Sequence, residues 1–444
     1  MMLFSGGTVV TMDPVIGDLA RGDVLVRDDR IVAVGPDLRS HPEAAGATVI
    51  DTGGRIVSPG FVDTHRHAWQ AQLRRSIPDV TDLGAYVMST LAGIAPAYTA
   101  HDMYVGTRLA ALTALDAGIT TMLDFSHNSR TAAHSDAAIQ ALVDTGIRGV
   151  HASMGPHFGD WDRQWPGDLA RVCEAYQGVN GGLVTLRLAA LATDEIAGPA
   201  LAYGPELAAV ARDLGLGVSV DAVFGESSSA AILRWAADGL LNPELTLIHA
   251  TGLTPQAWQA MGDAGVTVSL APTSEPQIGL ETAVPAIDEA LAAGIRPGLS
   301  IDVEVALVSD MFTQMRTLHA IQRMRAVNAA YGTDATPHRI TTRDVLDFAT
   351  LQGARTNGLG DVTGSLTPGK QADLLVVNAE DINTMPLNDA IGTLVLGADP
   401  RNIETVLVAG QLRKRDGRLV GVDLNELCQD VTASRDTIRK TAAK

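Results

Sequence analysis

The sequence is poor in cysteine, in aromatic residues and in long apolar runs. Among its 444 residues are two cysteines, and aromatic residues make up 4% of the chain. Cys173 and Cys428 lie too far apart to suggest a disulfide framework, so we expect a reducing, cytoplasmic compartment. No stretch of about 18 consecutive apolar residues occurs, which predicts no transmembrane helix. The first residues lack a basic segment followed by an apolar run, so we expect no signal peptide.

Basic residues are also scarce, and several common motifs are absent. The chain has 33 Lys and Arg against 51 Asp and Glu, a net charge of −18. Such a chain attracts neither nucleic acid nor an anionic membrane surface, so we expect a small-molecule partner. There is no Gly-rich phosphate loop and no G-x-S-x-G motif. Phosphoryl transfer and Ser-triad hydrolysis are therefore not supported.

Both ends of the chain are rich in short strand patterns. The first 57 residues predict strands at 7–12, 22–26, 30–34 and 48–51. Residues 366–422 predict strands at 372–377, 405–409 and 411–414, with a hairpin turn at Asp416-Gly417. Each end alone is too small to bury a sheet face. We therefore predict that residues 1–57 and 366–422 together build one small β-sandwich domain.

Between these ends, residues 58–365 alternate strand and helix patterns, which is typical of βα units around a parallel sheet. A first apolar strand around 56–62 ends at His67. Seven more strands are predicted at 120–125, 146–152, 183–188, 217–223, 245–249, 266–270 and 298–302. Eight parallel units predict an α/β fold of the (β/α)8 TIM-barrel type, with its chemistry at the carboxyl ends of the strands. Helices are expected at 310–330 and 342–349, and residues 423–444 form a helical tail.

The stretch 58–67, which reads SPGFVDTHRH, carries the first chemical signal. His65 and His67 are two residues apart in a strand, so both imidazoles point to the same face. Two converging imidazoles make half of a site for zinc or iron. The alternative is an ordinary pair of core or surface histidines, because so short a motif is common by chance.

This motif, taken with two stretches near the other end, resembles the amidohydrolase superfamily. Residues 349–355 read ATLQGAR and residues 364–374 read GSLTPGKQADL, similar to the closing signature of the cytosine-deaminase and triazine-hydrolase branch. The resemblance covers residues 1–422. It implies a metal-dependent hydrolase that uses activated water to cleave a C–N bond (deamination or amide hydrolysis) or a C–halogen bond. The expected substrate is a small N-heterocyclic or aromatic compound, and members of this fold commonly form homodimers or larger homo-oligomers.

The resemblance assigns roles to two further strand-end residues. Asp302 ends the predicted eighth strand, where the family has a metal ligand that also accepts the proton of the attacking water. His249 ends the sixth strand, where the family ligates the metal or contacts the electrophile and leaving group. A carboxylate beside activated water suits general-base work. The plainer alternatives are a helix N-cap for Asp302 and a satisfied core histidine for His249.

The fifth strand departs from the family pattern. The family has a metal-binding histidine there, and this chain has Asp221 at the matching position. An aspartate oxygen can still ligate zinc, iron or manganese, so Asp221 is a candidate ligand; alternatively it is a polar group in a site whose metal is weak or absent. Glu226 is a candidate catalytic glutamate, although its offset is longer than the H-x-x-E spacing of relatives.

The fourth strand has no lysine, whereas relatives with two metals use a carboxylated lysine there. We therefore expect one divalent metal, zinc before iron or manganese. Arg187 on that strand is a candidate for binding an anionic substrate group, or else a salt-bridge residue. The other predicted substrate-binding residues follow strand ends: Trp69, Gln70, His127, His157, Ser274 and Glu275. Trp69, Trp161 and Trp165 suggest either a flat pocket wall or ordinary loop packing.

Two other functions stay open at this point. The altered fifth strand is compatible with a repurposed site for elimination, decarboxylation or cyclisation. A metal-free barrel that binds or assembles is the third hypothesis. Four convergent ligand-type residues argue against it, since a scaffold does not need them.

Overall fold

The computed structural model describes all 444 residues, and these form two compact units. The first unit contains 1–63, 113–121 and 310–421, and the second contains 64–112, 122–309 and 422–444. Each unit therefore draws on distant parts of the chain.

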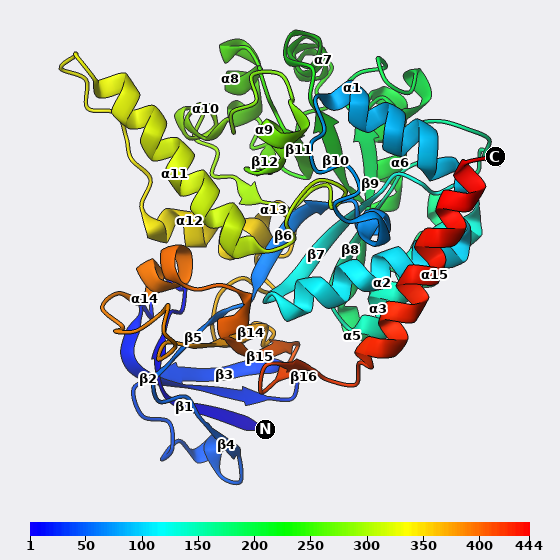
Figure 1. The fold of residues 1–444 in the computed structure, drawn as a ribbon. Helices are drawn as coiled ribbons and strands as arrows, with labels where there is room; N and C mark the ends of the chain where they lie inside the picture. The colour runs from blue at the N-terminus through cyan, green and yellow to red at the C-terminus, as the bar shows by residue number, and fades with distance from the viewer. The chain divides into compact units, whose positions relative to one another are not determined.

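The first unit is built on one mixed sheet that both ends of the chain share (Figure 1). The strand order is β17-β16-β15-β14-β5-β1-β2-β3, with β4 paired to β1. Antiparallel pairing of β5 with β14 joins the two ends, with Val57 opposite Val376. A sheet built from both chain ends is thus confirmed, and it is one continuous sheet. The strands are β1 (Met2–Val9), β2 (Leu19–Arg27), β3 (Arg30–Gly35), β4 (Thr48–Asp51), β5 (Arg55–Pro59), β14 (Leu374–Asn378), β15 (Ile403–Val408), β16 (Gln411–Arg415) and β17 (Arg418–Leu419).

Apolar side chains on one face of this sheet form its core, among them Phe4, Val26 and Leu407. The predicted hairpin turn at Asp416-Gly417 is confirmed, since both residues have the positive φ that a tight hairpin needs. The helices of this unit are α11 (Met311–Ala330), α12 (Thr342–Phe348), α13 (Leu351–Thr356) and α14 (Ala390–Gly392). The first two match the expected helices at 310–330 and 342–349.

The eight-stranded sheet of the barrel has the order β13-β12-β11-β10-β9-β8-β7-β6. Its ends meet where the amide of Asp302 donates to the carbonyl of His65 at 2.9 Å and the amide of His67 donates to Asp302 at 3.3 Å. This contact closes the ring, which confirms the predicted (β/α)8 barrel. The strands are β6 (Phe61–Arg66), β7 (Ile119–Ser126), β8 (Arg148–Ser153), β9 (Val184–Leu191), β10 (Gly217–Ala222), β11 (Leu245–His249), β12 (Thr267–Leu270) and β13 (Gly298–Leu299).

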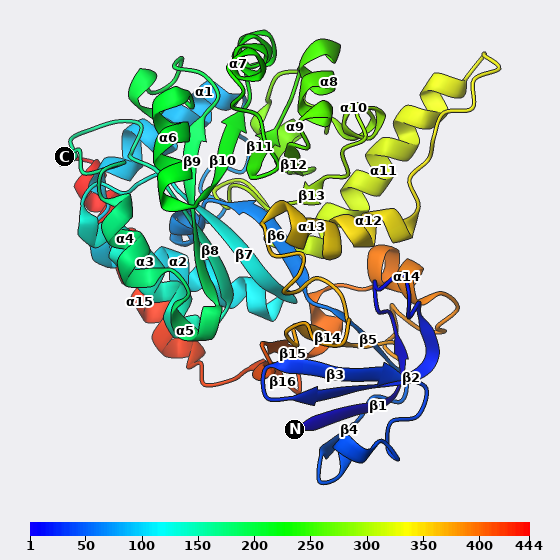
Figure 2. The same ribbon diagram turned by 180° about the vertical axis from the view of Figure 1, so that it is seen from behind.

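Helices surround this sheet, and Figure 2 shows α3, α4 and α6 outside β8, β9 and β10. The helices of the second unit are α1 (Leu83–Tyr86), α2 (Ala100–Asp116), α3 (Ala132–Thr145), α4 (Leu169–Tyr176), α5 (Val179–Gly182), α6 (Pro205–Leu214), α7 (Gly225–Ala237), α8 (Pro255–Asp263), α9 (Ser274–Ile278), α10 (Ile287–Ala292) and α15 (Leu424–Ala442). A π-helical segment at Val87–Ile94 continues α1. None of the helices is long and apolar enough to cross a membrane.

One predicted strand is really two. The apolar run around 56–62 divides at Gly60 into β5, which belongs to the composite sheet, and β6, which belongs to the barrel. A Cβ on Gly60 would lie 2.1 Å from Oγ1 of Thr120, so only glycine fits where the chain passes between sheets. The eighth strand is also shorter than predicted, because regular pairing ends at Leu299.

Candidate active site

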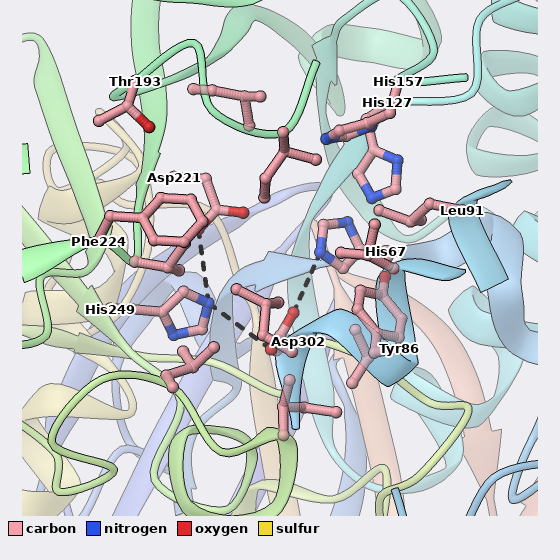
Figure 3. Close-up of a pocket in the computed structure, with 18 residues that line it drawn as sticks. His67, Tyr86, Leu91, His127, His157, Thr193, Asp221, Phe224, His249 and Asp302 are labelled. Atoms are coloured by element: carbon pink, nitrogen blue, oxygen red, sulfur yellow. Dashed lines mark ion pairs between the residues drawn. The ribbon is translucent and has the colours of Figure 1, made fainter. Parts of the chain in front are cut away.

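Five side chains meet at the carboxyl ends of the barrel strands, and we call them the floor: His65, His67, Asp221, His249 and Asp302. The ligand atoms of His65, His67 and Asp302 lie within 4.8 Å of one another, and so do those of His65, Asp221 and His249. Four of the five line one pocket, where Figure 3 shows Asp221, His249 and Asp302 turned toward a common point. The strand-end placement brings together the residues predicted as metal ligands.

Asp302 is the centre of the ion pairs in the floor. Its Oδ1 lies 3.2 Å from Nε2 of His65 and 3.1 Å from Nε2 of His67, and its Oδ2 lies 3.7 Å from Nε2 of His249. Burial alone would raise the pKa of the Asp302 carboxyl, but hydrogen bonds to His65 and His67 and the charge of His249 hold that pKa well below its usual range. These contacts therefore keep Asp302 in its ionised carboxylate form.

His249 faces carboxylates on both sides of its ring. Its Nδ1 lies 3.3 Å from Oε1 of Glu275, and its Nε2 lies 3.7 Å from Oδ1 of Asp221. Burial lowers the pKa of His249, but the Glu275 hydrogen bond and the charges of Asp302 and Asp221 outweigh burial and raise the pKa to about 9. A histidine held in its protonated form can donate a proton.

The backbone is strained at two floor residues. His249 and Asp302 both have φ of 65°, in the left-handed region that non-glycine residues seldom adopt. Such a conformation costs on the order of 1 to 3 kcal/mol and persists only where the surroundings enforce it. Here the barrel closure at Asp302 and the carboxylates around His249 supply that constraint.

The ring nitrogens of His67 test whether the floor suits a divalent metal. Nδ1 lies 3.2 Å from the carbonyl oxygen of Phe125, while Nε2 lies 3.1 Å from Oδ1 of Asp302. A neutral imidazole has one N–H. With a metal bound, Nδ1 would donate this N–H to Phe125 and the Nε2 lone pair would face the metal in place of the hydrogen bond to Asp302, as in metal-ligating histidines. Oδ1 of Asp221 is buried without a hydrogen-bond partner. This donor set fits zinc, iron or manganese.

A buried ion-pair network supports the floor from behind. Oε1 of Glu304 accepts a hydrogen bond at 2.9 Å from Nη1 of Arg66, which stands between the two histidines of β6. Arg74 pairs with the other oxygen of the same carboxylate. Burial would raise the pKa of Glu304, but Arg74 and Arg66 lower it below its usual value. The network ties the segment that carries Asp302 to the strand that carries His65.

Ser274 and Glu275, predicted to bind substrate, lie at the start of α9 and contact the floor instead of lining the pocket. Oγ of Ser274 donates to Oδ2 of Asp302, and Oε1 of Glu275 accepts from the amide of Ala271 at 2.9 Å as well as meeting His249. Both are fully buried. Ser274 is therefore positioned to orient Asp302, and Glu275 to orient His249.

His127 and His157 do line the pocket, after β7 and β8. The ring of His127 lies 4.2 Å from that of His67 and 4.8 Å from that of His157, measured between centroids. Burial and the neighbouring imidazoles keep the pKa of His127 well below its usual value. Burial, with a smaller contribution from His67, lowers the pKa of His157 to about 3. Both are therefore neutral imidazoles near the floor.

Apolar side chains surround the pocket above the floor, and we call this set the collar: Leu83, Val87, Leu91, Ile196, Ile278 and Leu280. Three of them come from α1 and the π-helical segment, and the others from the loops after β9 and β12. Tyr86 and Phe224 add aromatic rings. The collar gives the pocket apolar walls above the polar floor.

The predicted tryptophan wall is not part of this pocket. Trp69 is buried beside Tyr98, with ring centroids 4.9 Å apart. Gln70 is buried too, and its Nε2 donates to the hydroxyl of Tyr86 at 2.7 Å. Trp165 donates to the carbonyl of Ser153, and Trp161 lies under Arg163. The alternative of ordinary packing describes the tryptophans better, because none of the three lines the pocket and each has a packing or hydrogen-bond partner of its own.

Two other site predictions need correction. Arg187 is buried in the barrel, where it donates to Oγ of Ser219 at 3.0 Å and to the carbonyls of Val218 and Glu244 at 2.8 and 2.9 Å. Its N–H groups donate to these protein acceptors, so the side chain is not placed to bind a substrate anion. Glu226 is exposed in the first turn of α7 and does not line the pocket. Phe224 stands instead at the H-x-x-E spacing from Asp221 and lines the pocket.

Sequence reasoning missed the collar and the Glu304 network. The apolar cluster at 83–94 was a usable signal, because a hydrophobic helix directly after the H-x-H motif has to pack near the strand ends. Glu304 follows Asp302 by two residues, but nothing in the pattern distinguishes a buried carboxylate from an exposed one.

Comparison with known proteins agrees with this geometry. Residues 56–413 match the sequence model of the Amidohydrolase family. The chain is 27% identical to the 5-methylthioadenosine/S-adenosylhomocysteine deaminase of Moorella thermoacetica, with 97% of this chain and 98% of that protein covered. It is 25% identical to the 5'-deoxyadenosine deaminase of Methanosarcina mazei, with 98% of each covered.

Solved structures share the fold at lower identity. An adenosine deaminase from Xanthomonas campestris with bound zinc superposes with a TM-score of 0.83 at 22% identity, covering 99% of this chain and 98% of that one. An atrazine chlorohydrolase from Arthrobacter aurescens complexed with zinc gives a TM-score of 0.82 at 22% identity, covering 98% and 100%. These similarities confirm the predicted barrel with its composite β-domain.

Proposed function

The chain belongs to the amidohydrolase family, and from that premise we propose that it removes the amino group of an amino-substituted nitrogen heterocycle by hydrolysis. The observation that carries the proposal is the convergence of the five floor residues at the base of a pocket with apolar walls. The deaminase names of the relatives favour an amino group over a halogen as the leaving group.

In this proposal His65, His67, Asp221 and Asp302 hold one divalent metal, and protonated His249 lies beside them as the proton donor. Zinc is our first choice because two structural neighbours contain zinc. When bound there, a divalent metal supplies Lewis-acid chemistry and makes water a nucleophile near neutral pH. The chain's own residues then position the reactants and move the protons.

Asp302 takes the proton of the attacking water on its ionised carboxylate. Water adds to the ring carbon that bears the amino group, and the carbon–nitrogen bond then breaks. His249 donates a proton to the departing nitrogen, which leaves as ammonia, and the ring keeps the oxygen of water. Ser274 and Glu275 hold Asp302 and His249 in position for these transfers.

The test measures ammonia release from a panel of aminopurines, aminopyrimidines and aminotriazines in water enriched in heavy oxygen, using zinc-loaded protein. We expect at least one amine to release ammonia and to give a ring product that carries the heavy oxygen. Asp302→Asn, loaded in the same way, is the control and should release ammonia about 1,000-fold less efficiently. Product without heavy oxygen would contradict hydrolysis and favour elimination or another repurposed reaction.

A further inference from the structure

We propose that the pocket selects an uncharged heterocycle whose substituent away from the reacting carbon is apolar, and that it rejects carboxylated or phosphorylated counterparts. This inference rests on the proposed deamination and specifies the substrate class of the same site.

The charge of the pocket lining is the first support. No lysine or arginine lines the pocket, and its only carboxylates are Asp221 and Asp302 in the floor. The whole chain adds a net charge of −18. An anionic substituent on the side away from the reacting carbon would therefore leave water and meet no lysine or arginine beside the collar.

Arg130 and Arg187, which lie near pocket residues in the sequence, cannot supply the missing cation. Arg130 donates to the carbonyls of Ala95, Phe158 and Asp160 at 3.2, 2.9 and 3.0 Å, which holds the loop that carries His157 in place. Arg187 is bound inside the barrel, as described above. Turning either side chain toward a ligand would leave buried carbonyls without donors, which is unfavourable.

The collar gives the second support. Leu91, Ile278 and Leu280 are each at most 5% exposed, so they form a closed apolar wall. Phe224 adds a ring beside Asp221, where Figure 3 shows it facing the pocket. Flat apolar groups pack well against such a wall.

The few polar groups above the floor can form hydrogen bonds with the heterocyclic ring itself. His127, His157 and Thr193 line the pocket, and Nδ1 of His157 is buried without a hydrogen-bond partner. Imidazole and hydroxyl groups can pair with one or two polar atoms of a neutral ring. These groups are therefore placed to orient a heterocycle through one or two hydrogen bonds.

The test uses adenine derivatives that carry, at the same ring nitrogen, a butyl, a carboxypropyl or a phosphonopropyl group. Deamination of each gives kcat/KM, and calorimetry with the corresponding purines that lack the amino group gives Kd independently of turnover. We expect the butyl compounds to exceed both anionic ones by about 100-fold in kcat/KM and in affinity.

Thr193→Arg places a cation at a half-buried position of the lining and should improve binding and turnover of the carboxypropyl compounds about tenfold. Ala200→Arg, an exposed position a few residues later in the chain, is the matched control and should change neither. Thermal unfolding of both variants checks that the fold is intact.

The outcomes separate this inference from the proposed function. Equal kcat/KM or equal affinity for neutral and anionic members overturns the selectivity, even if ammonia is released. If the butyl compound binds more tightly than the anionic ones but no ammonia is released, the selectivity is supported and deamination of this ring class is overturned. Failure of all three purines to bind overturns the selectivity as well.

Discussion

Floor residues stand at or near the ends of barrel strands and are held by buried charged partners, whereas collar residues stand on loops and short helices and are held by apolar packing. Asp302 illustrates the first type, with ion pairs to three histidines and a strained backbone. Leu91 illustrates the second type. It lies in a π-helical segment and is held by packing in an apolar cluster.

This difference indicates which residues determine the reaction and which determine the choice of substrate. Ion pairs and hydrogen bonds are directional, so the floor can hold protons and a cation at fixed points. Apolar packing is not directional, so the collar can change its shape without disturbing the chemistry. Changes in the floor should therefore abolish turnover, whereas changes in the collar should alter which molecule is accepted.

Loss of the central carboxylate should have the largest effect. Asp302→Asn keeps the size of the side chain but removes the group that accepts the proton, so kcat/KM for ammonia release should fall about 1,000-fold. Circular dichroism and denaturant unfolding should show the fold retained. Asp194→Asn, an exposed position, is the control. Full activity in Asp302→Asn would disprove the role of the floor.

Breaking the network behind the floor should cost stability. Glu304→Gln removes the charge that compensates Arg66 and Arg74, and an unpaired buried charge costs about 3 to 5 kcal/mol. Urea unfolding measures the loss, with exposed Glu195→Gln as the reference. An unchanged free energy of unfolding would show that the network does not support the site.

Opening the collar should affect binding more than catalysis. Leu91→Ala removes apolar contact with the substrate, so KM should rise about tenfold while kcat changes little. Met88→Ala lies in the same π-helical segment but is 66% exposed, and both constants should stay as in the wild type. A fall in kcat with unchanged KM in Leu91→Ala would contradict the division between floor and collar.

Arg187→Met should have the smallest effect on turnover. The buried carbonyl of Val218 and the carbonyl of Glu244 would lose a donor, which lowers the free energy of unfolding by about 1 to 3 kcal/mol. Activity per folded molecule should not change. A specific rise in KM would restore the hypothesis that Arg187 binds substrate.

Most of the barrel and much of the floor could be predicted from the sequence. Parallel strands buried on both faces appear as apolar runs, and their carboxyl ends converge, so His65, His67, His249 and Asp302 could be located from strand positions alone. Asp221 could be located in the same way, although its role could not. The composite sheet followed from strand patterns at both chain ends.

The collar was only partly predictable: the apolar cluster at 83–94 was a usable signal, but the packing of the loop residues Ile196 and Leu280 depends on contacts that leave no periodic pattern. Trp69 and Arg187 show the same limit. An aromatic ring or a guanidinium near a strand end can face the pocket, the barrel or a loop with the same sequence spacing. Only the structure shows that Trp69 packs on Tyr98 and that Arg187 bonds to the barrel backbone.

The most direct test of the account is the zinc content of the wild type and of three variants after reloading and removal of free metal. The account predicts stoichiometric zinc in the wild type and in Leu91→Ala, and loss of zinc in His65→Ala and Asp221→Ala. Retention of zinc by His65→Ala, or its absence from the folded wild type after reloading, would contradict a metal-dependent floor. Retention by Asp221→Ala alone would remove Asp221 from the ligand set.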